Sequence, residues 1–208
     1  MQSVQKNETR PAAQKGFSLL EMIIVMAIAL IVMAGAVLMV RGTLQTYKAD
    51  QAANIVTTQL RNARQLAISQ RRWVKVTFDS SIGAPDFAPH VSYQLTNVNS
   101  LGNNGRVVTL PLARTTQFTL FAGLPDTPMA FGNSSAIYLG GVAGGPPNMY
   151  FGPTGIFTSA PSTNNIINGT LFVGIPGQTF SARAVTILGA TGRVRTYTWA
   201  GGSTGWRE

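Results

Sequence analysis

The sequence of 208 residues contains no cysteine and only one histidine, His90. The absence of cysteine excludes a disulfide framework, a thiolate zinc site, a cysteine nucleophile and a cysteine-ligated iron–sulfur cluster. Acidic residues are also few, because seven Asp and Glu stand against sixteen Lys and Arg, for a formal net charge of +9. We therefore expect no metal and no cofactor. The length suits one ordinary domain with an additional segment.

Motifs for catalysis are missing as well. No Gly-x-Ser-x-Gly elbow frames a serine nucleophile, and the glycine-rich stretch 140–148 lacks the ending of a phosphate-binding loop. Asp79, Asp86 and His90 lie in one stretch that prolines interrupt, without a further acid nearby, so we interpret them as solvated loop residues. No catalytic residue is assigned. A membrane-tethered hydrolase is the least favoured function class.

A long hydrophobic run lies near the amino terminus. Met22 to Val40 are 19 consecutive residues without charge or proline, and as a helix they span roughly 28 Å, close to the hydrocarbon thickness of a bilayer. A buried core helix and a secretory signal are the alternatives, but the apolar part of a signal is usually shorter and is followed by a small-residue cleavage site. Cations precede the run and place residues 1–15 in the cytoplasm: Lys6, Arg10 and Lys15, against Glu8.

One acid interrupts the apolar stretch that begins at Phe17. Glu21 lies four residues into it, and a carboxylate in hydrocarbon costs about 2 to 3 kcal/mol unless it finds a partner. A cation from a neighbouring molecule would stabilise it, which implies packing among many helices rather than one isolated anchor.

The residues Gly16-Phe17-Ser18-Leu19-Leu20-Glu21 resemble the processing site of type IV prepilins and type II secretion pseudopilins. The resemblance implies that a prepilin peptidase cuts after Gly16 and N-methylates Phe17. It also implies that Glu21 pairs with the terminal amine of a neighbouring subunit during filament assembly. The protein would then be a single-pass protein of the bacterial inner membrane, in contact with lipid, with a cytoplasmic amino terminus and a periplasmic head.

The helical pattern continues beyond Arg41. Apolar residues recur at spacings of three and four up to Ala67, and no proline stands between Pro11 and Pro85. We expect one helix from about Phe17 to Ser69, buried in lipid in its first half and packed on a core in its second. The expected organisation is a leader, a membrane and assembly half-helix, an amphipathic half-helix and a β-rich head, at residues 1–16, 17–41, 42–72 and 73–208.

From Trp73 the periodicity changes from about 3.6 to 2. Short runs rich in β-branched and aromatic residues alternate with Gly, Pro, Asn and Ser clusters, which is typical of antiparallel strands. The fold class is therefore expected to be α+β, a long helix packed on an antiparallel β-rich head. Strands are expected near residues 74–78, 91–95, 106–112, 116–121, 136–139, 149–151, 156–158, 170–175, 183–188 and 193–199.

Three segments, 60–78, 150–155 and 191–195, resemble the GspH/FimT branch of minor pseudopilins and minor pilins. Together with the processing site, this likeness implies a type IV pilin-like fold and a non-enzymatic filament subunit. Its partners would be other pilin or pseudopilin subunits, the prepilin peptidase and an inner-membrane assembly platform. A type II secretion pseudopilus and a type IV pilus both remain open. The insertions around 79–105 and 140–170 have no counterpart in this family.

The segment Gly192-Arg193-Val194-Arg195 resembles a motif tied to DNA binding in the natural-transformation members of that family. On a strand, Arg193 and Arg195 project from one face about 7 Å apart, near a phosphate spacing. Arg183 joins them if the preceding strand pairs as a hairpin, which gives a small DNA-binding or other anion site. The alternative is that these arginines only keep an exposed strand soluble.

The positive charge on the long helix suggests a contact between subunits. Loss of residues 1–16 removes three cations and one acid, so the processed chain carries +7. Much of that charge lies on the long helix, and an alternative use for it is subunit contact, with Arg61 or Arg64 paired to a neighbouring subunit's Asp50 in an assembled shaft.

Overall fold

A computed structural model describes residues 17–80, 89–95, 107–146, 148–161, 165–202 and 205–208. Its one α-helix in this part of the chain, α1, runs from Leu19 to Gln70. This confirms the helix expected over 17–69. The chain forms two compact units that divide between Gly42 and Thr43, and they are described one at a time.

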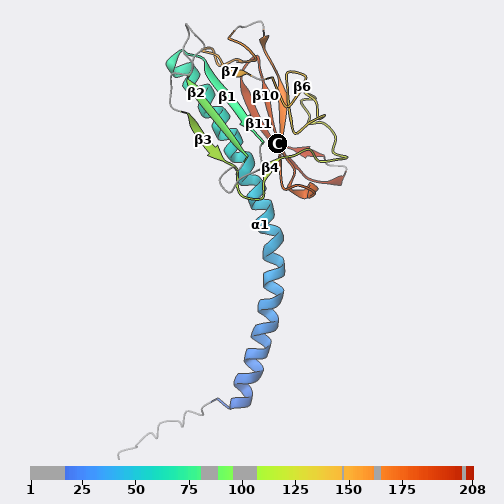
Figure 1. The fold of residues 1–208 in the computed structure, drawn as a ribbon. Helices are drawn as coiled ribbons and strands as arrows, with labels where there is room; N and C mark the ends of the chain where they lie inside the picture. Colours follow the sequence, from blue (N-terminus) through green and yellow to red (C-terminus); the bar gives the residue numbers. More distant parts are fainter. Residues whose placement is uncertain (1–16, 81–88, 96–106, 147, 162–164, 203–204) are drawn as a thin grey trace, which may run out of the picture. The chain divides into compact units, whose positions relative to one another are not determined.

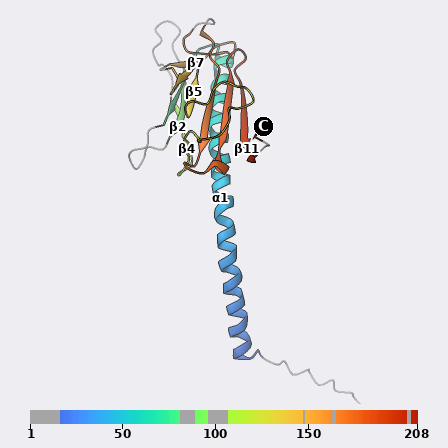
Figure 2. The same cartoon turned by 90° about the vertical axis from the view of Figure 1, so that its right-hand side faces the viewer.

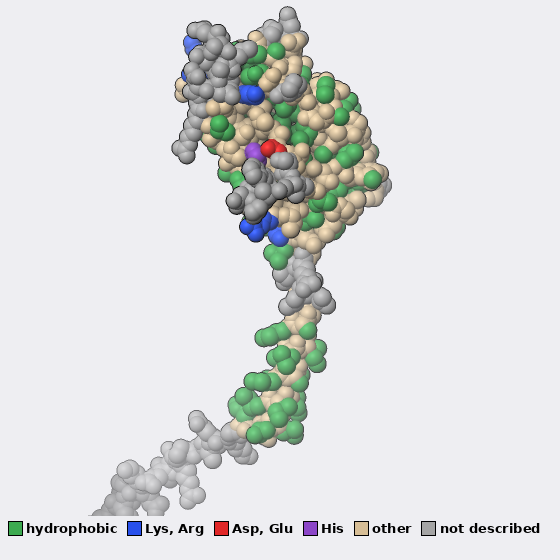
Figure 3. Space-filling view, in the orientation of Figure 1, with side chains coloured by type: hydrophobic (Ala, Val, Ile, Leu, Met, Phe, Trp, Pro, Cys, Tyr) green, Lys and Arg blue, Asp and Glu red, His purple; other side chains and the backbone are tan. Residues whose placement is uncertain are grey.

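The first unit contains the apolar part of α1. Residues Leu19–Ala36 are long and apolar enough to cross a membrane, and none of their surface is buried within the protein. Hydrophobic side chains cover this part of the helix (Figure 3). So much exposed apolar surface is unfavourable in water, and this segment is stabilised by an apolar environment.

The second unit, residues 43–208, contains two antiparallel sheets (Figure 1). The five-stranded sheet has the order β3-β2-β1-β7-β8. Its central strand follows the helix after only a short turn, in which Arg71 adopts a positive φ of 51°. The strands are β1 (Val74–Asp79), β2 (His90–Leu95), β3 (Val108–Pro111), β7 (Met149–Phe151) and β8 (Phe157–Thr158).

The seven-stranded sheet has the order β12-β11-β10-β9-β5-β6, and β4 also pairs with β9. Hairpin β10–β11 is at its centre, with Arg183 opposite Thr198 and Leu188 opposite Arg193. The strands are β4 (Gln117–Phe118), β5 (Ile137–Leu139), β6 (Val142–Ala143), β9 (Gly169–Gly174), β10 (Arg183–Leu188), β11 (Arg193–Trp199) and β12 (Trp206–Arg207). A short 3-10 turn, Thr179–Ser181, precedes β10.

Both sheets pack on the second half of α1, and Figure 2 shows β2 and β11 on opposite sides of it. The helix contributes small residues, which allow the strands to approach closely. Ala63 and Ala67 are fully buried, as are Val74 of β1 and Val185 of β10. One core therefore joins helix and sheets: Ala52, Ala53, Val56 and Leu60 of α1 with Val76, Phe151, Leu171, Val173, Ile187 and Val194 of the strands.

The seven-stranded sheet is also covered on its other face. A second cluster packs there, and the indole of Trp206 donates a hydrogen bond of 2.8 Å to the carbonyl oxygen of Pro125. Asp126 holds the covering segment, because its two carboxylate oxygens accept 2.7 Å bonds from the amides of Thr127 and Gly132. The cluster comprises Phe121, Phe172, Ala182, Ala184, Tyr197 and Trp206.

The observed α+β architecture, a long helix followed by antiparallel sheets, confirms the expected fold class. Every expected run contains a strand, although β3 and β4 are shorter than expected. The sequence analysis missed β6 and β12. Strand β6 lies in the glycine-rich stretch, where Gly140, Gly141 and Gly144 adopt positive φ around this two-residue strand.

Candidate functional site

The first candidate site is the beginning of α1. Phe17 lies just before the helix and is 79% exposed. The helix begins at Leu19, and the amide of Met22 donates to the carbonyl oxygen of Ser18 at 3.2 Å. The predicted cleavage point, after Gly16, precedes this helical turn. Gly16 itself is outside the described residues.

Glu21 lies in the first turn of α1 and is exposed. A carboxylate at a helix amino terminus interacts favourably with the helix dipole, but the surrounding apolar side chains offer no counterion. The nearest cations along the sequence are Lys15 and Arg41. No cation stands between Phe17 and Val40, so a cation from another molecule is one way to stabilise a buried Glu21 carboxylate.

The second candidate site is on hairpin β10–β11. Val194 and Thr196 face α1, because Val194 belongs to the main core and the hydroxyls of Thr57 and Thr196 are 2.8 Å apart. Alternation along the strand places Arg193 and Arg195 on the opposite face. Arg193 is exposed, so the expected placement of these two arginines on one strand face is confirmed.

Arg195 is bound to other residues on that face. Its Nη1 donates to Oε2 of Glu208 at 3.1 Å. A side-chain hydrogen bond with Tyr197 is the largest cause that raises the pKa of Arg195 above its ordinary value. Desolvation acts against it, and the charge of Glu208 raises the pKa further. The guanidinium therefore stays cationic across the physiological pH range, with part of its charge neutralised by Glu208.

The structure contradicts the prediction that Arg183 joins these arginines. The hairpin forms, but its register puts Arg183 opposite Thr198, at the far end from Arg193 and on the face toward α1. Only 2% of its side chain is exposed. Its Nε donates to Oδ1 of Asp50 at 2.5 Å, and Nη1 donates to the carbonyl oxygens of Phe180 and Ala182 at 3.2 and 3.0 Å. A phosphate cannot reach it.

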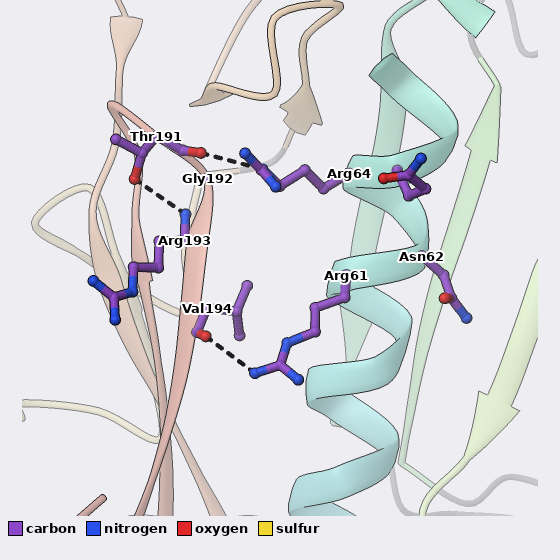
Figure 4. A pocket seen from close by; sticks show the side chains of 8 residues that line it. Arg61, Asn62, Arg64, Thr191, Gly192, Arg193 and Val194 are labelled. Atoms are coloured by element: carbon purple, nitrogen blue, oxygen red, sulfur yellow. Dashed lines mark hydrogen bonds between the residues drawn. The ribbon is translucent and has the colours of Figure 1, made fainter. Parts of the chain in front are cut away.

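The helix arginines are also used within the chain (Figure 4). Nε of Arg64 donates to the carbonyl oxygens of Gly155 and Thr191 at 3.3 and 3.1 Å. Nη2 of Arg61 donates to the carbonyl oxygen of Val194 at 3.4 Å. The expected pairing of either arginine with a neighbouring subunit's Asp50 stays a prediction; within the chain, Oδ1 of Asp50 accepts from Arg183.

These contacts enclose an open cleft of about 710 Å³ between α1 and the β10–β11 turn. Gly192 forms the turn with a φ of 62°, and a Cβ there would collide with the carbonyl oxygen of Gly155. Glycine is thus required by the close approach of this turn to the backbone of Gly155. The lining residues are Arg61, Asn62, Arg64, Gln65, Thr191, Gly192, Arg193 and Val194.

The sequence did not predict this cleft, because its arginines are held by backbone carbonyl oxygens. Every residue has such an oxygen, so no sequence pattern marks the acceptor. Among the described residues, no group of three or more His, Cys, Asp or Glu could hold a metal ion. Asp79 and His90 are cross-strand neighbours on β1 and β2, 4.0 Å apart, rather than residues of one loop. Asp86 lies outside the described residues.

Comparison with known proteins gives one sequence match. Residues 11–37 match the prokaryotic N-terminal methylation motif, a prepilin-type motif that covers the end of the expected leader and much of the apolar part of α1. No curated protein matches the chain.

Two solved structures are similar in fold, both of the type IV minor pilin FimU of Pseudomonas aeruginosa strain PAO1. The first, in space group P21, is 17% identical with a TM-score of 0.44, over 78% of this chain and 94% of that one. The second, in space group P65, is 18% identical with a TM-score of 0.41, over 76% and 97%.

Proposed function

We propose that this protein is a non-enzymatic subunit of a bacterial filament, a minor pilin or minor pseudopilin of the GspH/FimT kind. The observation that carries the proposal is the prepilin-type methylation motif at residues 11–37. It coincides with an exposed apolar helix that contains one acid, Glu21.

The proposed pathway has two steps on this chain. A prepilin peptidase removes residues 1–16 by cutting after Gly16 and methylates the new amine on Phe17. The amine of one subunit then pairs with the Glu21 carboxylate of its neighbour, which supplies the cation that this acid lacks in its own apolar surroundings. The described structure supports this order, because Phe17 precedes the helix and Glu21 is accessible in its first turn.

Before assembly the protein would be held in the inner membrane by residues 17–41. Lys6, Arg10 and Lys15 keep the amino terminus in the cytoplasm, so residues 73–208 form a periplasmic head. Assembly would involve other pilins and an inner-membrane platform. Its role would then be mechanical, as part of either a type II secretion pseudopilus or a type IV pilus, and gene neighbourhood distinguishes these two systems.

Processing can be tested by mass spectrometry of the chain purified from a host that contains a prepilin peptidase. The wild-type chain is expected to begin at Phe17 and to carry one additional methyl group on its amine. A Gly16→Val chain is expected to keep its leader, because a branched side chain blocks the bond that the peptidase must reach.

Gln14→Val is the matched control, since it places the same side chain two residues earlier, and it should be processed like the wild type. An intact leader on the wild-type chain, or cleavage at another bond, would contradict the proposal.

DNA binding by the head is the second candidate function. It is favoured by Arg193, which is exposed and has no acidic partner among the described residues, two positions from Arg195. The burial of Arg183 reduces this site from three arginines to two.

Binding of duplex DNA to the full chain in detergent is therefore expected to weaken for Arg193→Gln with Arg195→Gln. The slope of log K against log salt should fall by about one per arginine. Unchanged affinity and slope would remove the assigned residues from any DNA site.

A further inference from the structure

The cleft between α1 and the β10–β11 turn is a concave surface rich in hydrogen-bond donors. Arg61 and Arg64 contribute cations to its lining, and Asn62, Gln65 and Thr191 contribute amides and a hydroxyl. Arg193 also lines the cleft, but its side chain extends away from the helix arginines (Figure 4). No carboxylate is among the lining residues that the structure describes. A cleft of this composition attracts an oxyanion.

The two helix arginines keep most of their donors available. Each guanidinium has five N–H groups. Arg64 uses Nε alone, shared between two carbonyl oxygens, which fixes the orientation of its side chain. Arg61 uses one nitrogen in a long 3.4 Å bond. Figure 4 shows both side chains extending from the helix toward β11, so the orientation of the fork is set before a ligand arrives.

Unlike the helix arginines, the described acidic side chains of residues 43–208 are occupied by contacts within the chain. Each described side-chain carboxylate of residues 43–208 has a partner within the chain. Asp50 binds Arg183, Asp79 is near His90, Asp126 accepts two backbone amides, and Glu208 binds Arg195. A second copy of this head therefore has no unpaired carboxylate to offer among its described residues, which favours an acid from a different protein as the complement.

We propose that this cleft binds a side-chain carboxylate in an acidic segment of a different subunit of the same filament, an inference that rests on the function proposed above. The segment places an Asp or Glu against the free edge of the Arg61 and Arg64 guanidiniums, in the planar two-bond geometry that arginine forms with carboxylates. Asn62 and Gln65 then bind the polar backbone of the same segment.

A peptide fits this surface better than a DNA duplex. The arginine forks face inward between helix and strand, whereas DNA-binding arginines must reach phosphates on a convex backbone. In the view of Figure 4 the side chain of Arg193 extends away from the helix arginines, toward the other face of β11. The cleft and the Arg193–Arg195 face are thus two different surfaces.

The test uses the full chain in nanodiscs of uncharged lipid and a fluorescent oligo-glutamate peptide, with binding measured by anisotropy. Arg61→Glu is expected to weaken binding by at least about tenfold, the effect of losing one charged hydrogen-bonded contact. Arg114→Glu is the matched control, because Arg114 is exposed outside the cleft and the net charge changes equally. It should stay within about twofold of the wild type.

Thermal unfolding of both variants establishes that the head is folded, since Arg61 loses only one long bond. Equal losses for Arg61→Glu and Arg114→Glu, or no binding of oligo-glutamate by the wild type, would overturn the proposal. So would duplex DNA that binds in an Arg61-dependent way while the peptide does not. Because this measurement needs neither leader cleavage nor assembly, its failure is distinguishable from a failure of the processing test.

Discussion

Glu21→Ala is expected to remove the protein from assembled filaments while leaving it in the membrane. The substitution eliminates a charge from the apolar segment, so insertion becomes more favourable by about 2 to 3 kcal/mol. The substitution also removes the only acid between Phe17 and Val40, and with it one partner of the proposed ion pair between subunits. Removing one partner of a buried ion pair destabilises the structure by about 3 to 5 kcal/mol. Incorporation should therefore fall by about a hundredfold or more, measured as the fraction of the chain that sediments with sheared filaments.

Two further variants separate charge from size. Glu21→Gln keeps the shape of the side chain but cannot form an ion pair, and it is expected to fail like alanine. Ser18→Ala changes another exposed residue at the same end of the helix and should assemble normally. If the Glu21→Ala chain is incorporated into filaments as well as the wild-type chain, the proposed role of this carboxylate is excluded.

The second large effect is expected at the contact between Asp50 and Arg183. Asp50→Ala leaves a guanidinium that is 2% exposed without its carboxylate, and an uncompensated buried charge of this kind costs about 3 kcal/mol or more. The melting temperature should fall by roughly 6 to 12 °C. It can be followed by tryptophan fluorescence in detergent, since Trp73, Trp199 and Trp206 all lie in residues 43–208.

The pair also predicts a rescue. Arg183→Met in the Asp50→Ala background removes the stranded charge and keeps an apolar stem, so most of the lost stability should return. Asp79→Ala is the control, because Asp79 is half exposed and 4.0 Å from His90, and an exposed pair contributes about 1 kcal/mol or less. Equal destabilisation by Asp50→Ala and Asp79→Ala would contradict the assigned burial.

The helix and most strands were predictable because their signals are local. An apolar run followed by spacings of three and four fixes α1, and the change to alternation at Trp73 marks its end within a few residues. Strand β12 was missed because it has two residues. What holds it is the packing of Trp206 against Trp199 and against Phe172, which is distant in sequence.

The arginines show what could not be predicted. Arg183 and Arg195 are both near the same hairpin, and only the register decides that one faces α1 and the other faces away. Shifting the register by one residue would exchange those faces. The binding of Arg61 and Arg64 to carbonyl oxygens was equally hidden, since any residue could supply that acceptor.

The order of synthesis gives the helix–sheet core a further property. Residues Ala52 to Ala67, which form the helical wall of the core, leave the ribosome long before their partners on β10 and β11. Thr57 and Thr196 are 139 positions apart, and contacts of such long range make folding slow. An apolar helix face thus stays uncovered until nearly the whole chain has been made. This nascent head would depend on chaperones, and a chain truncated before β10 would be a substrate for proteolysis.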